Sequence, residues 1–257
     1  MQYQSYPILE FDPAPLGKLT ACAALSPQAP KLPELCVITF FRDSLTQISQ
    51  DPNFRLLGHL HSEIVDLPIY AAKVHGKEVC ITLAFPGSAG AAATLEELRA
   101  MGAKRFVICG GAGCLAPDLT VGNLLLPTCA VRDEGASYHY LSPSREVACC
   151  PDAVRKAAAF LKEKNVSFLE CKTWTTDAIY RETPDKIVLR RNEGCMTVEM
   201  ESAAFFAVSQ FYSLPLVQLL YAGDDLSGEK WDLRGWTSRH DVRENLILLS
   251  LELVTLL

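Results

Sequence analysis

Residues 196–225 read MTVEMESAAFFAVSQFYSLPLVQLLYAGDD and contain two strand patterns separated by a helix pattern. Residues 196–200 have the character of a short strand, and residues 201–213 combine small and aromatic residues over the length of a helix. Residues 214–225 form an apolar strand that ends in two acids. A strand, a helix and a second strand in succession indicate parallel pairing, because the helix carries the chain back to the starting edge of the sheet.

The same alternation extends in both directions from this segment. Strand patterns occur at residues 35–40, 77–85, 104–113, 121–131 and 166–176, and helix patterns occur at residues 93–102, at residues 151–165 and near the C-terminus. The sequence therefore predicts a single α/β domain, residues 35–257, with a mixed, largely parallel central sheet flanked by helices on both faces. Residues 1–34 are rich in Pro and Ala and are expected to form an irregular N-terminal arm.

Composition limits the classes of function. The 257 residues carry 24 Lys and Arg against 30 Asp and Glu, a net charge of −6, so nucleic acid is not expected as a partner, because phosphate binding needs clustered cations. No uncharged apolar run reaches about 18 residues, so no membrane contact is expected. The N-terminus lacks the pattern of a signal peptide. Ten cysteines scattered through the sequence, mostly in apolar runs, are typical of a reduced, cytoplasmic protein.

Two carboxylates, Glu199 and Glu201, stand at the junction between the short strand and the helix. Burying a carboxylate without a partner is costly, yet no Lys or Arg occurs between Glu193 and Lys230. In this architecture ligands bind at the carboxyl ends of strands, and a helix N-terminus there tolerates negative charge. We therefore expect both acids at the rim of a ligand crevice.

Three further segments follow predicted strands. FPGSAGAA, residues 85–92, places Ser88 at a helix start, where its hydroxyl can donate to an anion. CGGAGCLAP, residues 109–117, is expected to form a glycine turn. The turn either offers free backbone N–H groups to a phosphate or a sugar or is purely structural. AGDDLSG, residues 222–228, is either a capped turn or the source of a proton donor. No metal site is expected, because HLH, residues 59–61, lacks further ligands at suitable spacing.

These motifs in this order resemble the nucleoside phosphorylase-I family. The matching segments are GGAGCLAPDLTVGNLLLP (residues 110–127), TTDAIYRET (residues 175–183), VEMESAA (residues 198–204) and AGDDL (residues 222–226), and the resemblance runs from about residue 35 to the C-terminus. The family includes purine nucleoside phosphorylases, uridine phosphorylases and methylthioadenosine/S-adenosylhomocysteine nucleosidases. The resemblance implies their α/β fold and cleavage of an N-glycosidic bond.

The resemblance also implies roles for ribose-binding and catalytic residues. Glu201 matches the carboxylate that accepts hydrogen bonds from both ribose hydroxyls. Met200 matches the residue that packs beneath the sugar, and Glu199 supports the site from behind. Asp224 matches the general acid that protonates or hydrogen-bonds N7 of a purine. Uridine phosphorylases typically lack an acid at this position, so a purine base is favoured.

The base and phosphate positions follow from the same comparison. Asp177, Ile179 and Tyr180 match the stretch that lines the base pocket, where an aromatic face can stack on the ring. Family phosphorylases hold phosphate with a GDP-x-R loop after the first strand and with a second Arg before the glycine turn. This chain retains the Asp of that loop and has Thr and Ile at the two Arg positions. The residues concerned are Asp43, Thr46 and Ile108, and the candidate phosphate set is Arg42, Asp43, Gly87, Ser88, Gly110 and Gly111.

The expected function is phosphorolysis of a purine ribonucleoside to free base and ribose-1-phosphate, with inorganic phosphate as co-substrate and no other cofactor. The absent Arg anchors leave hydrolysis open, as in the methylthioadenosine nucleosidases, with Asp43 as the candidate base for water. Uridine phosphorolysis and nucleoside binding without catalysis are further alternatives, and retention of Asp224 beside Glu201 argues against the second. Because related enzymes often complete their pockets with a neighbouring subunit, the resemblance implies a homo-oligomer, whether dimer, trimer or hexamer.

Overall fold

The structure is a computed structural model that describes residues 3–257, in which strands and helices alternate. The strands are β1 (Leu35–Thr39), β2 (Arg55–Leu60), β3 (Leu67–Val74), β4 (Lys77–Leu83), β5 (Arg105–Cys114), β6 (Leu124–Asp133), β7 (Glu146–Ala148), β8 (Phe168–Thr176), β9 (Cys195–Glu199) and β10 (Leu216–Asp225). The helices are α1 (Ala21–Ala24), α2 (Arg42–Ile48), α3 (Ser88–Ala100), α4 (Pro151–Glu163), α5 (Pro184–Asn192), α6 (Ser202–Phe211) and α7 (His240–Val254). The predicted α/β class is confirmed.

One mixed sheet contains all of these strands, in the order β10-β6-β8-β9-β5-β1-β4-β3-β2, with β7 on β6. Parallel pairings join β4, β1, β5 and β10, and a second parallel group joins β6, β8 and β9. The edge formed by β2, β3 and β4 is antiparallel. Because β10 pairs with both β5 and β6, and β9 pairs with β5 and β8, the strands β10, β6, β8, β9 and β5 close into a ring.

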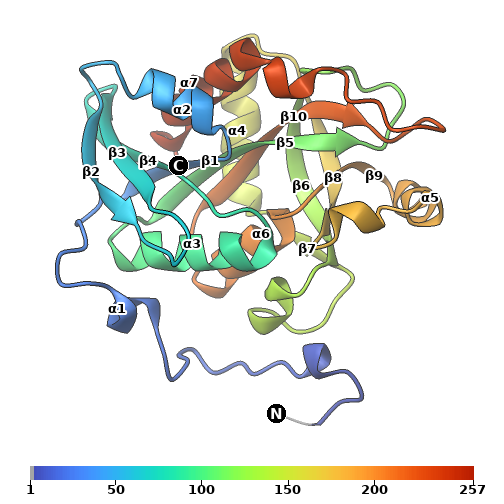
Figure 1. The fold of residues 1–257 in the computed structure, drawn as a ribbon, viewed down its shortest axis with the longest axis horizontal. Coiled ribbons are helices and arrows are strands. Elements are labelled where there is room, and N and C mark those ends of the chain that lie inside the picture. Colours follow the sequence, from blue (N-terminus) through green and yellow to red (C-terminus); the bar gives the residue numbers. More distant parts are fainter. Residues whose placement is uncertain (1–2) are drawn as a thin grey trace.

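Helices cover both faces of the sheet, as predicted (Figure 1). Helix α3 packs against α6 on one face, and α7 packs against β5, β1 and α2 on the other. Every residue of β1 is buried, which explains its continuous apolar sequence, since a parallel strand covered on both faces has no solvent-facing side. Helix α6 is buried over eight of its ten residues, so it lies within the protein without a polar face.

Residues 3–34 contain little regular structure. They include the 3₁₀ turn Pro7–Leu9 and the single turn of α1, and they run along the outside of the molecule (Figure 1). Several of their large apolar side chains, including those of Tyr3, Leu16 and Leu19, are mostly exposed. Regular structure of the domain begins with β1.

The glycine turn predicted for residues 109–117 is wrong, because β5 continues through it to Cys114. Gly110 pairs with Leu220 and Gly111 with Tyr221 of the neighbouring parallel strand. A Cβ atom at Gly111 would lie 3.2 Å from the Tyr221 ring and 3.3 Å from the Trp236 ring. The glycines therefore allow aromatic side chains to approach the strand closely, and they do not bend the chain.

Some elements were not predicted from the sequence. The hairpin of β2 and β3, the three-residue strand β7 and the helix α5 had no clear periodic pattern. Strand β2 is half exposed and β7 is very short, so neither has the apolar run of a central strand. Helix α5 is polar, with Arg190 as its one buried residue, and it contacts the domain through ion pairs and through Ile187, which packs on a small apolar cluster.

Candidate active site

A cavity of about 700 Å³ lies where β1, β5, β9 and β10 end. Its lining comes from segments that are far apart in the sequence. These are Phe40 and Phe41 after β1, residues 110–113 of β5, residues 198–201 at the β9–α6 junction, Gln218, Leu220, Asp224 and Leu226 in and after β10, Ile179, Tyr180 and Glu182 before α5, and Trp231, Trp236 and Arg243 near α7. The position is at the carboxyl ends of the parallel strands β1, β5 and β10, the end at which parallel α/β sheets bind ligands.

Glu199 holds the junction between β9 and α6. Its Oε2 accepts hydrogen bonds from the backbone N–H groups of Glu201 (2.7 Å) and Ser202 (2.6 Å). Its Oε1 accepts from the hydroxyl of Thr175 on β8 (2.6 Å). The first N–H groups of a helix have no partner within the helix, so this carboxylate satisfies the start of α6. Burial raises the pKa of Glu199, and the hydrogen bonds act in the opposite direction.

Glu201 lies on the cavity wall directly after Glu199 and Met200. Its Oε1 accepts a hydrogen bond from the backbone N–H of Gly87 at 2.7 Å. Gly87 has φ 85°, a conformation that favours glycine. Burial, and then the negative charge of Glu199, raise the pKa of Glu201 to about 8. The protein thus donates one hydrogen bond to this carboxylate. The remaining lone pairs of its two oxygens can accept hydrogen bonds from the two hydroxyls of a vicinal diol.

Ser88 and Asp177 bind each other outside the lining of the cavity. The Ser88 hydroxyl donates to Asp177 Oδ1, and the backbone N–H of Gly135 donates to Asp177 Oδ2 at 2.8 Å. The donors that the sequence assigned to an anion at residues 87–88 therefore bind carboxylates in this structure. Asp177, which was predicted in the base pocket, anchors the start of α3 to the segment that follows β8.

The two adjacent acids at the end of β10 point in different directions. Asp224 lines the cavity, where its Oδ2 accepts a hydrogen bond from Trp231 Nε1 at 2.6 Å. Asp225 binds Arg234 in an ion pair and accepts from the backbone N–H of Ser227 at 2.8 Å. These contacts lower the pKa of Asp225, although burial opposes them. Only Asp224 is thus available to a ligand in the cavity.

The predicted base-pocket residues Ile179 and Tyr180 line the cavity at its mouth, where Tyr180 is almost fully exposed. Glu182 lines the same part of the cavity and was not singled out from the sequence. Burial, and then the charge of Asp224, raise the pKa of Glu182 to about 7. Its motif, TTDAIYRET, was visible in the sequence, but nothing in the spacing distinguished this acid from its neighbours.

The candidate phosphate residues are divided between places. Gly110 and Gly111 line the main cavity. Arg42 lies instead beside a second, smaller cavity near the β2–β3 hairpin, together with Thr46, and Asp43 is exposed on α2. Ile108 is fully buried within β5. The predicted set therefore does not converge on one point in this structure.

Arg243 of α7 is the single cationic side chain that lines the main cavity within the described residues. Its Nε donates to the hydroxyl of Tyr221 at 3.0 Å, and its Nη2 donates to the carbonyl of Trp236 at 3.4 Å. Its guanidinium lies 5.3 Å from the ring centre of Phe41 and 5.2 Å from that of Trp236. Its hydrogen bonds go to neutral oxygens, so its charge remains available to an anion. No sequence motif pointed to this residue.

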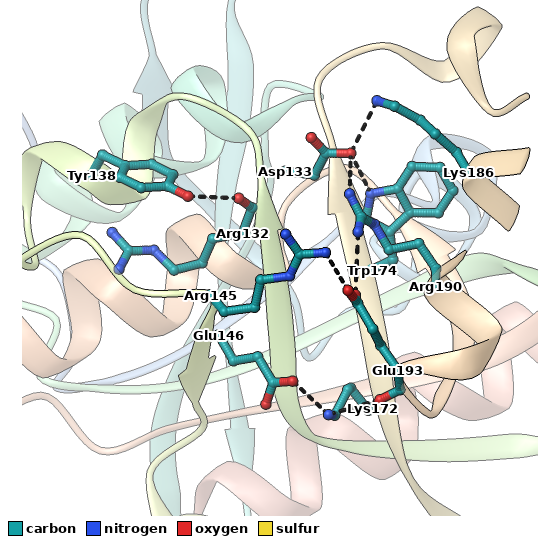
Figure 2. A network of polar contacts seen from close by, with 10 residues as sticks. All are labelled: Arg132, Asp133, Tyr138, Arg145, Glu146, Lys172, Trp174, Lys186, Arg190 and Glu193. Carbon is teal, nitrogen blue, oxygen red and sulfur yellow. Dashed lines mark hydrogen bonds and ion pairs between the residues drawn. The ribbon is translucent and has the colours of Figure 1, made fainter. Parts of the chain in front are cut away.

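A network of ion pairs holds α5 against β6 and β8 (Figure 2). Asp133 Oδ2 accepts from Arg190 Nη2 (2.9 Å), Lys186 Nζ (3.1 Å) and Trp174 Nε1 (3.0 Å). Arg190 is almost fully buried and also binds Glu193, so its charge is paired, as buried charges require. Its Nε has no hydrogen-bond partner within the described residues. The network fixes the helix that begins two residues after Glu182.

Within residues 3–257, no three His, Cys, Asp or Glu side chains gather as a metal site would require. No helix in this range has the length and apolar character needed to cross a membrane.

Residues 34–252 match the sequence profile of the phosphorylase superfamily. A region of 142 residues is 27% identical to the guanosine phosphorylase of Halorubrum lacusprofundi and covers 55% of this chain and 59% of that protein. A region of 152 residues is 27% identical to the uridine phosphorylase of Haemophilus influenzae and covers 52% and 59% of the two chains. These alignments thus span less than two thirds of either relative.

Solved structures show the same fold at low identity. The uridine phosphorylase from Vibrio fischeri ES114 superposes with a TM-score of 0.74 at 19% identity, over 88% of this chain and 93% of that one. The AMP nucleosidase from Bacteroides thetaiotaomicron superposes with a TM-score of 0.70 at 20% identity, over 87% and 88%. The family resemblance inferred from the motifs is confirmed, and the chain belongs to the phosphorylase superfamily.

Proposed function

We propose that the protein cleaves the N-glycosidic bond of a purine ribonucleoside with inorganic phosphate and releases the free base and ribose-1-phosphate. The observation that carries the proposal is that Glu201, at the start of α6, and Asp224, at the end of β10, line one cavity. Membership of the phosphorylase superfamily supports an enzyme. Relatives named guanosine phosphorylase and purine nucleoside phosphorylase support a purine nucleoside as substrate.

Ribose binds at Glu201 in this proposal. A carboxylate can accept the 2′- and 3′-hydroxyl hydrogens together, and such charge-assisted bonds are among the stronger ones in proteins. Burial, and then the charge of Glu199, raise the pKa of Glu201 to about 8, which favours the protonated form in the empty site. Binding of two hydroxyl donors favours the ionised form, so the diol displaces this proton. Met200 packs against the sugar from the same segment.

The reaction breaks the bond between C1′ and the base nitrogen and forms a bond between C1′ and a phosphate oxygen. Positive charge develops on the sugar ring in the transition state, as in other glycosidic cleavages. The carboxylate of Glu201, ionised when it binds the diol, stabilises this charge in the proposal. Asp224 takes up a proton from solvent and donates it to N7 of the departing purine, so the base leaves as a neutral molecule and Asp224 returns to its ionised form.

Phosphate requires a cation, and Arg243 supplies one in this proposal. Phe41, which its guanidinium contacts, immediately precedes α2, the place where the family carries its phosphate loop. Burial raises the pKa values of Glu182, Glu199 and Glu201. The cavity is therefore less negative at neutral pH than its four acids suggest, which reduces repulsion of an anion.

Hydrolysis is the second candidate, and Gln218 favours it. Gln218 lines the cavity at 1% exposure, and its Oε1 has no hydrogen-bond partner within the described residues. A buried unpaired carboxamide oxygen is costly, and a water molecule would satisfy it. A neutral water also needs none of the Arg anchors that Thr46 and Ile108 replace.

The test is incubation of the purified protein with guanosine, inosine, adenosine and uridine, each with and without phosphate. We expect base release that requires phosphate and yields one ribose-1-phosphate for each base. Release of base and free ribose without phosphate would support hydrolysis instead. A Glu201→Ala preparation, purified in parallel, controls for host phosphorylases. Failure of every nucleoside to release base above this control would contradict both candidates.

A further inference from the structure

Trp231 lines the main cavity and has had no role assigned so far. It lies in the segment between β10 and α7, and 63% of its surface is exposed. Its Nε1 donates a hydrogen bond to Asp224 Oδ2 at 2.6 Å. An indole N–H can donate and cannot accept, so this contact holds Oδ2 of the candidate general acid as an acceptor.

The two oxygens of Asp224 have different surroundings. Oδ2 meets the indole of Trp231. Oδ1 lies near Gly113 of β5, where a Cβ atom would be 3.6 Å from it. The same Cβ atom would lie 2.6 Å from Leu226 and 3.1 Å from Val198, so glycine at this position permits the close packing. Oδ1 is thus placed at the wall that β5 contributes to the cavity.

The turn that carries Trp231 is anchored to the domain by contacts of its own. Asp225 and Asp232 exchange two backbone hydrogen bonds, at 2.8 and 3.0 Å. Arg234 forms a mostly buried ion pair with Asp225, and its Nη1 donates to the carbonyl of Leu119 at 2.8 Å. A donor on an anchored turn is pre-organised, which reduces the entropy lost when its hydrogen bond forms.

The donor on Oδ2 decides which oxygen carries the acidic proton. A protonated carboxyl group has one O–H donor and one carbonyl oxygen, and the carbonyl oxygen accepts hydrogen bonds. Because the indole N–H needs an acceptor, Oδ2 takes the part of the carbonyl and Oδ1 that of the hydroxyl. A base in the cavity excludes water from this contact, and a hydrogen bond is stronger in surroundings of lower dielectric constant.

We propose that Trp231 is a positioning residue for Asp224, whose indole N–H holds Oδ2 so that Oδ1 presents the proton to N7 of the departing purine. This inference rests on the proposed function. The indole transfers no proton itself. In Trp231→Phe the ring remains and the N–H is lost, so the carboxyl group can rotate and the proton can reside on either oxygen.

The experiment measures kcat and KM for guanosine and for a nitrophenyl riboside in the wild type and in Trp231→Phe. We expect kcat for guanosine to fall by about 10–100-fold, the order of loss when a catalytic group is misplaced by about 1 Å. The nitrophenyl riboside, whose aglycone leaves without a proton, should be affected much less. Lys230→Ala is the matched control, because Lys230 is the exposed neighbour of Trp231 outside the cavity lining; it should behave as the wild type.

The same substitution in an Asp224→Asn protein gives a second readout. Trp231→Phe should have no further effect there, since the acid that it positions is gone. Three results overturn the inference alone: an unchanged kcat for guanosine, an equal loss on both substrates, which indicates a stacking or structural role, or the full loss in the Asp224→Asn background. A wild type that cleaves no purine nucleoside contradicts the proposed function, and the inference falls with it.

Discussion

Replacement of Glu199 tests whether this acid holds the β9–α6 junction. Glu199→Ala removes the acceptor of three short hydrogen bonds, from the N–H groups of Glu201 and Ser202 and the hydroxyl of Thr175, at 2.6–2.7 Å. A longer contact from the Thr173 hydroxyl, at 3.4 Å, is also lost. Each buried donor left without an acceptor costs about 1–3 kcal/mol. Part of this loss in stability is offset, because water can enter the vacated space and because the variant no longer buries a carboxyl group. We expect a net loss of about 3 kcal/mol in the free energy of unfolding.

The assay is thermal and denaturant unfolding at fixed protein concentration. For a chain of this size, about 3 kcal/mol corresponds to a fall in Tm of roughly 6–12 °C. Glu199→Gln is the matched control, because one amide oxygen can still accept the backbone N–H groups; it should lose only about 1 kcal/mol. The KM for the nucleoside should rise in Glu199→Ala, since the backbone of Glu201 loses its anchor. A Glu199→Ala protein within about 0.5 kcal/mol of the wild type would refute this reasoning, because surface substitutions have effects of that size.

Three other substitutions address the remaining parts of the site. Because the pKa of Glu201 is raised from 4.5 to about 8, the folded protein keeps a proton that the unfolded chain releases, so stability falls as the pH rises from about 4.5 towards 8. In Glu201→Gln the difference in Tm between pH 5 and pH 8 should shrink; an unchanged difference contradicts the assignment. Asp224→Asn should lower kcat on purine nucleosides by about 10²–10⁴-fold and much less on a nitrophenyl riboside, whose base needs no proton; equal activity on purine nucleosides would show that Asp224 only caps a turn. Arg243→Met should raise the KM for phosphate by about 10–100-fold, the equivalent of one charge-assisted bond, while nucleoside binding without phosphate stays constant; an unchanged KM would exclude Arg243 from the phosphate site.

Strands and helices with strong local patterns were predictable from the sequence. Residues 35–40 were recognisable because a central strand buried on both sides is a continuous apolar run. Residues 166–176 were recognisable by their aromatic and β-branched residues, although the first half of β8 is largely exposed. Glu199 and Glu201 were identifiable because they stand at the start of an apolar helix with no Lys or Arg nearby in the sequence. Burying such carboxylates is costly unless a ligand or the backbone supplies hydrogen-bond donors. The order of motifs was sufficient to identify the family.

The tertiary structure decided which side chains meet in the cavity. Of the adjacent acids Asp224 and Asp225, only the first faces the cavity, because neighbouring residues of a strand point to opposite sides and β10 has a register shift between Ala222 and Asp225. Arg243 reaches the site through the packing of α7 against β5 and β1, a contact between residues more than a hundred positions apart. Sequence patterns report local periodicity, and long-range contacts of this kind depend on how the layers of the domain pack together.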